Sequence, residues 1–78
     1  MEVIQTKKIA SVNLAEVLIS ADEIEVYQTA LELALDKMSE QEIENKFGAT
    51  RNEIEGILND LRQTSKTCSE NQLEPALA

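Results

Sequence analysis

Two pairs of carboxylates have a spacing that could support acid–base chemistry if the segments carrying them are helical. Glu32 and Asp36 are four residues apart, and so are Glu40 and Glu44. Close carboxylates can split their pKa values so that one donates a proton while the other accepts one. The chain has no histidine and a single cysteine, however, so the usual catalytic bases, nucleophiles and metal ligands are scarce. We therefore interpret both pairs as solvated helix surface and predict a protein that is not an enzyme, with no catalytic residues, metal or cofactor.

A second group of side chains has the chemistry to contact duplex DNA. Arginine, lysine, threonine and asparagine bind phosphates and base edges. The candidates for DNA binding are Lys46, Thr50, Arg51, Asn52 and Arg62. The alternative interpretation is a helix-capping threonine with solvated neighbours. The formal net charge of −8 favours that alternative, because an acidic protein repels phosphates unless its cations gather on one face.

The positions of these groups depend on three predicted helix starts. Ser20, Ser39 and Thr50 are each followed three residues later by glutamate and then by apolar residues at helical spacing. This is the capping-box pattern, in which the hydroxyl and the carboxylate satisfy free backbone N–H groups at a helix start. The predicted helices span residues 21–37, 40–47 and 51–63.

The second and third predicted helices share a pattern of apolar residues around a tight turn. Ile43 and Phe47 would pack the second helix, Gly48 would permit the turn, and Thr50 would cap the third helix. The buried face of the third helix would then consist of Ile54, Ile57, Leu58 and Leu61. The pattern resembles the helix-turn-helix of bacterial transcription regulators, in particular the last domain of sigma factors and the effector domains of response regulators. The resemblance covers about residues 21–63.

That resemblance implies a DNA-binding transcriptional regulator that reads DNA with the start of its third helix. The chain departs from the family at Glu44, where a small residue is usual, and in the acidic character of its third helix. The alternative function is an acidic adaptor that binds a protein partner through the same fold. A single face carrying Lys46, Arg51 and Arg62 would favour DNA binding, and an acidic exposed face on the third helix would favour the adaptor.

The ends of the chain are predicted from weaker patterns. Residues 1–19 form an N-terminal arm or short helix: residues 1–9 fit a short strand or a disordered arm, and residues 13–19 fit a short helix. Residues 20–64 form the three-helix domain, and the mostly polar residues 65–78 form a disordered tail. The predicted fold class is therefore all-α. The apolar surplus favours a homodimer or partner interface made by Leu14, Val17, Leu18, Val26 and Leu33. The alternative is that this apolar surface packs in the core of the chain itself.

The sequence also bears on location. No signal peptide is visible at the N-terminus, and no apolar stretch approaches the roughly 20 residues that span a bilayer. The single cysteine, Cys68, fits a reducing compartment. We therefore expect a cytoplasmic protein without a membrane partner.

Overall fold

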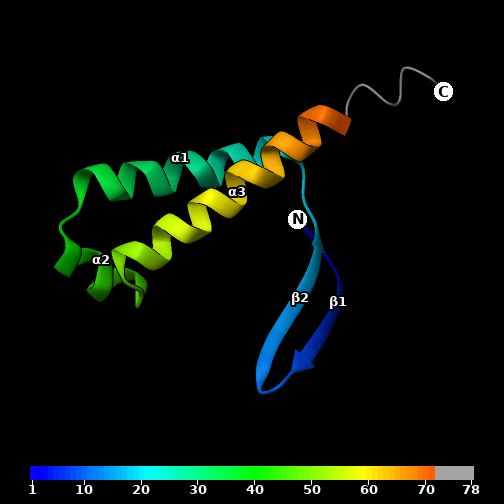
Figure 1. Ribbon diagram of the computed structural model, residues 1–78, viewed down its shortest axis with the longest axis horizontal. Coiled ribbons are helices and arrows are strands. Elements are labelled where there is room, and N and C mark those ends of the chain that lie inside the picture. Colours follow the sequence, from blue (N-terminus) through cyan, green and yellow to red (C-terminus); the bar gives the residue numbers. More distant parts are fainter. Residues whose placement is uncertain (72–78) are drawn as a thin grey trace.

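The computed structural model describes residues 1–71, which form a β-hairpin followed by three helices (Figure 1). The strands are antiparallel. The elements are β1 (Glu2–Ile9), β2 (Val12–Leu18), α1 (Ala21–Lys37), α2 (Glu40–Phe47) and α3 (Arg51–Asn71). The prediction of an all-α fold is wrong, because two strands precede the helices and the fold is α+β.

The hairpin replaces the arm or short helix predicted for residues 1–19. A strand over residues 1–9 was one of the alternatives, but the short helix over residues 13–19 is wrong. The two strands join through Ala10 and Ser11, which both have positive φ values, 47° and 74°. Such two-residue turns match the twist of a hairpin, although they favour glycine and asparagine. Ile4 forms a bulge, because Val3 and Gln5 pair with adjacent residues of β2.

All three predicted helix starts are confirmed by their caps. The backbone N–H of Glu23 donates to Ser20 Oγ at 3.1 Å, which begins α1. At α2 the capping box is reciprocal, because the N–H of Ser39 also donates to the carboxylate of Glu42. This backbone hydrogen bond lowers the pKa of Glu42. At α3 the N–H of Glu53 donates to Thr50 Oγ1. The bounds predicted for α1 and α2 are therefore those observed.

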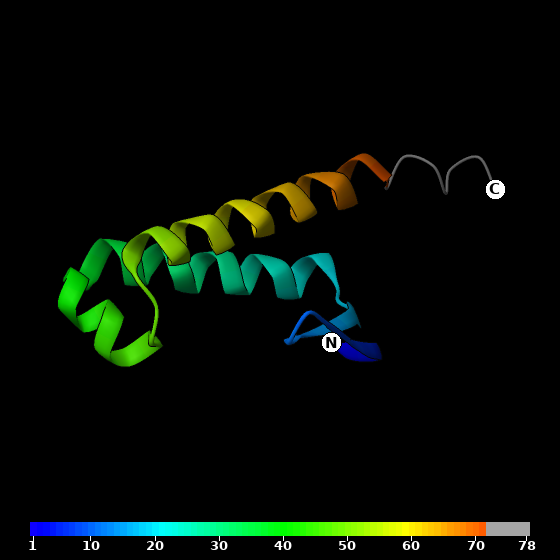
Figure 2. The ribbon, with the colours of Figure 1, turned by 60° about the horizontal axis from the view of Figure 1, so that its bottom comes forward.

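The core lies mainly between α1 and α3, which run side by side in opposite directions (Figures 1 and 2). The short helix α2 lies at the end of this pair that is away from the hairpin. Gly48 ends α2 in the left-handed conformation, with φ of 68°. The buried side chains are Ile24, Ala34, Ile43, Ile54 and Leu58. Two residues predicted in the core are not buried: Phe47 is 45% exposed and Ile57 is 48% exposed.

The third helix is longer than predicted, because it continues to Asn71 instead of ending near residue 63. The prediction of disorder is therefore wrong for residues 65–71, and residues 72–78 lie outside the described part of the chain. Leu61, Ser65 and Cys68 are all partly buried. Their spacing of three and four residues continues the inner face of α3 with small side chains.

Candidate functional site

The guanidinium of Arg51, the central candidate for DNA contact, is engaged within the chain. Its Nη2 donates to the backbone oxygen of Leu35 at 2.7 Å, and its Nε lies 3.5 Å from a carboxylate oxygen of Glu55. The first contact joins the start of α3 to α1, since Leu35 lies in the last turns of that helix. Arg51 therefore stabilises the packing of the two helices, and its donors are partly used.

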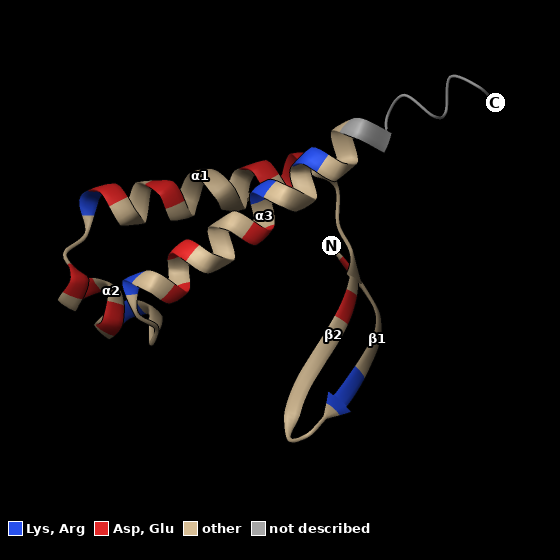
Figure 3. Ribbon diagram, viewed as in Figure 1, with Lys and Arg blue, Asp and Glu red and all other residues tan. Residues whose placement is uncertain are grey.

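The other two cations of the candidate site are separated and lie near carboxylates. Arg62 Nη2 lies 3.4 Å from Glu32 Oε2 on α1. Lys46 is exposed in the last turn of α2, one turn after Glu42. Along α1 and α2, several acidic positions accompany a single lysine in the last turn, and along α3 acidic positions lie between basic ones (Figure 3). The structure therefore does not gather these cations on a carboxylate-free face.

Carboxylates also surround the two polar candidates at the start of α3. Thr50 and Asn52 are exposed and line a shallow depression with Glu40 and Glu44 of α2. Exposed Glu53 and Asp60 share one side of α3, and exposed Glu55 lies beside Arg51. The two carboxylates of α2 are thus solvated, as expected, and they place negative charge where a helix-turn-helix protein would meet phosphates.

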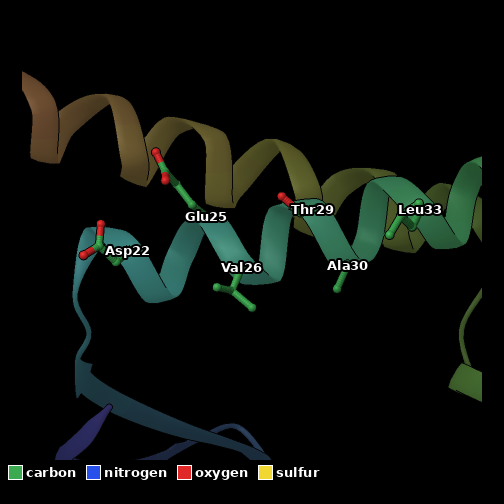
Figure 4. A pocket seen from close by; sticks show the side chains of 6 residues that line it. All are labelled: Asp22, Glu25, Val26, Thr29, Ala30 and Leu33. Carbon is green, nitrogen blue, oxygen red and sulfur yellow. The ribbon is translucent and has the colours of Figure 1, made fainter.

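The five residues predicted to form an interface all lie exposed: Leu14, Val17 and Leu18 on β2, and Val26 and Leu33 on α1. They belong to two surfaces. On α1, an open depression is lined by Asp22, Glu25, Val26, Thr29, Ala30 and Leu33. We call Val26, Ala30 and Leu33 the α1 stripe. Val26 and Ala30 project from α1 on the side away from α3 (Figure 4).

Glu23 joins the hairpin to α1, a role that the sequence pattern did not indicate. Its carboxylate accepts hydrogen bonds from the amino group of Met1 at 2.9 Å and from Tyr27 Oη at 2.6 Å. The hydrogen bond from Tyr27, followed by that from the amino group, lowers the pKa of Glu23. The same carboxylate raises the pKa of Tyr27. The capping pattern predicted only that this glutamate would return to its own cap.

We expect Glu23→Gln to loosen the hairpin while leaving the helices folded. The variant removes the charged acceptor of the amino group but keeps the backbone N–H that Ser20 caps. Amide hydrogen exchange should become faster in β1 and β2 and stay unchanged in α1 and α3. Glu25→Gln is the matched control, since its carboxylate has no hydrogen bond to the hairpin among the described residues. Equal exchange rates in both variants would contradict the link.

The lowered pKa of Glu23 determines the pH range over which its carboxylate stabilises the hairpin. A carboxyl whose pKa is lower in the folded state stabilises the protein above its usual pKa of 4.5 and loses that contribution as the pH falls through the folded value. In the parent chain, the protection of the hairpin amides, taken relative to their intrinsic exchange rates at each pH, should therefore fall on acidification below pH 4.5. Glu23→Gln should show less of this fall.

In the part of the chain that the structure describes, no group of three or more potential metal-ligating side chains occurs. None of the described helices combines the length and the apolar character needed to cross a bilayer. Comparisons with protein-family models, curated proteins and solved structures give no match.

Proposed function

We propose that this chain is a small acidic protein-binding module whose partner docks on the α1 stripe. The observation that carries the proposal is the exposure of Val26 and Leu33, which are 64% and 54% exposed on a helix that buries its opposite side against α3. Apolar side chains gathered on one exposed face mark interaction sites more often than isolated ones do. The stripe has a helical repeat of four and three residues, so it presents one continuous row.

The chemistry beside the stripe specifies the partner. Asp22 and Glu25 line the same depression, and the whole chain carries a net charge of −8. An amphipathic helix that presents apolar anchors at intervals of three and four residues fits such a row. Lysine or arginine at the edge of that helix would meet the two carboxylates. The partner surface is therefore a basic amphipathic helix of another protein.

DNA binding stays a hypothesis with less support. Arg51 and Arg62 contact groups of their own chain, and the exposed side of α3 is acidic. A duplex approaching α3 would meet carboxylates before it met free cations, and that repulsion is strongest at low salt. The assignment to the helix-turn-helix class, the absence of enzymatic activity and the cytoplasmic location likewise stay predictions from the sequence.

The proposal is tested by comparing two surface variants that each replace exposed apolar groups. Immobilised chain would capture partners from nuclease-treated cell extract, and the captured protein would be purified and its binding measured by calorimetry. We expect one stoichiometric partner whose binding is lost in the double variant Val26→Asp/Leu33→Asp. Ile57→Asp is the control, because it replaces an exposed apolar side chain on α3 and should leave binding unchanged.

Two outcomes would contradict this function. The first is a partner that binds the double variant as tightly as the parent chain, since the α1 stripe would then not be the docking surface. The second is binding of mixed duplex DNA at roughly 50 mM salt that weakens steeply as salt is added, which is the behaviour of a DNA-binding protein. Fluorescence anisotropy with labelled duplexes measures the second outcome directly.

A further inference from the structure

The β-hairpin receives little stabilisation from the rest of its own chain. Every residue of β1 and β2 is exposed, and the strands contact chiefly each other. A two-stranded hairpin alone is marginally stable in water, whereas three or more strands can hold together. Its turn adds a cost, because Ala10 and Ser11 adopt the left-handed conformation without being glycine or asparagine. The hairpin is therefore expected to gain stability by pairing with further strands.

The two edges of the hairpin differ in how readily a strand of another chain could pair with them. Lysines and bulges are common devices that keep an edge strand from pairing with another chain. β1 carries both, with Lys7 and Lys8 near the turn and the bulge at Ile4. β2 has neither lysine, proline nor bulge, and its one charged residue is Glu16. The open edge is therefore that of β2.

We infer that β2 pairs with β2 of a second copy of this chain, which gives a four-stranded antiparallel sheet in the order β1–β2–β2–β1. The two-fold axis passes midway between the two copies of Ala15, the middle residue of Val12–Leu18. A strand that pairs antiparallel with its own copy forms a closed interface, because each strand supplies the same surface. In this register, Ala15 faces Ala15 of the second copy, and Val12 faces Leu18.

The charges favour a dimer that pairs through the hairpins over one that pairs through the helices. Glu16 would lie opposite Leu14 of the second copy, and Lys7 is the β1 partner of that leucine. Glu16 and Lys7 of the second copy therefore share one face of the sheet at a spacing that the long lysine side chain can reach. The two Glu16 carboxylates do not face each other. Pairing through the acidic helices would instead bring like charges together.

This inference uses a surface separate from the α1 stripe and does not depend on the partner proposed above. In the dimer, the exposed Leu18 gains Val12 of the second copy as an apolar cross-strand neighbour. A dimer built in this way would carry two α1 stripes, one on each copy. The protein would then present its partner with two equivalent docking surfaces.

Cysteine cross-linking tests the pairing at its centre. In a Cys68→Ser background, Ala15→Cys would place two thiols directly opposite each other, at a Cβ separation that a disulfide can bridge. We expect mild oxidation to give a covalent dimer of twice the 8.7 kDa chain mass on non-reducing electrophoresis. Thr6→Cys is the matched control, since Thr6 lies on β1 and pairs with Ala15 of the same chain. Its two copies would lie about 14 Å apart, beyond disulfide reach.

A second variant keeps the proposal falsifiable without oxidation. Ala15→Lys would set two lysines facing each other at the axis, where like charges oppose pairing. Light scattering should report a dimer for the parent chain and a monomer for this variant, with the helical circular dichroism of both unchanged. A parent chain that is monomeric at the concentrations used for NMR would overturn the inference. Equal cross-linking of the two cysteine variants, or a dimeric Ala15→Lys, would also overturn it.

Discussion

Replacing Ile43 with alanine should cost about 2–5 kcal/mol of the free energy of unfolding. Ile43 is 0% exposed and is the buried residue of α2, so its loss leaves a cavity where this short helix meets the others. The whole chain is expected to have a free energy of unfolding of about 4–12 kcal/mol. The midpoint of thermal unfolding should therefore fall by between about 10 and 40 °C, as measured by circular dichroism.

Phe47→Ala is the matched control, because it removes a larger side chain from the same helix. Phe47 is 45% exposed, so much of its surface stays in contact with water in the folded state. We expect it to cost less than Ile43→Ala, the reverse of the order that side-chain size predicts. An equal or larger effect of Phe47→Ala would mean that Phe47 packs in the core, as the helix-turn-helix pattern predicted. The comparison thus tests the packing of α2.

The helix starts could be predicted from sequence because capping is local. Each hydroxyl and the backbone N–H it accepts from are three residues apart, so one short pattern contains both partners. Gly48 was also predictable as the end of α2, since left-handed termini favour glycine. The end of α3 was not predictable in this way, because its inner face continues through Ser65 and Cys68, which add little to an apolar pattern.

The hairpin was missed because its usual signals are absent from the sequence. The turn residues Ala10 and Ser11 do not have the strong preference for positive φ shown by glycine and asparagine. The alternation of apolar and polar residues is also interrupted, by the bulge at Ile4 and by the adjacent Lys7 and Lys8. With neither a turn signal nor a clean period of two, the leucines and valines of β2 suggested a helix face.

The exposure of the apolar candidates could be inferred from sequence, whereas the contacts of the charged candidates could not, and the interface itself stays a prediction. The exposure of Val26 and Leu33 follows from a helix face wider than one partner can cover. The hydrogen bonds of Arg51 and Arg62 could not be predicted from sequence, because their partners Leu35 and Glu32 are 16 and 30 residues away along the chain. Only the antiparallel packing of α1 on α3 brings these groups together.

Ile54→Asp should abolish folding, although Ile57→Asp, three residues later, should be tolerated. The sequence pattern placed both isoleucines on the buried face of α3, but Ile54 is 4% exposed and Ile57 is 48% exposed. An unpaired carboxylate at residue 54 would lose its hydration without a compensating partner, which costs several kcal/mol and strongly destabilises a domain of this size. The expected readout is loss of the cooperative unfolding transition in urea.

At residue 57 the new carboxylate stays hydrated, and the remaining cost comes from its neighbours on the helix surface. Glu53 and Asp60 lie one turn away on either side, and such like-charge pairs each cost about 0.2–0.5 kcal/mol. Ile57→Asp should therefore keep a cooperative transition, with a free energy of unfolding about 1 kcal/mol lower or less. Both variants add one negative charge, so the difference between their free energies of unfolding comes mainly from the burial of residue 54. If both variants unfold, α3 turns its Ile57 side inward, and the acidic exposed side of α3 that disfavours DNA binding is wrongly assigned.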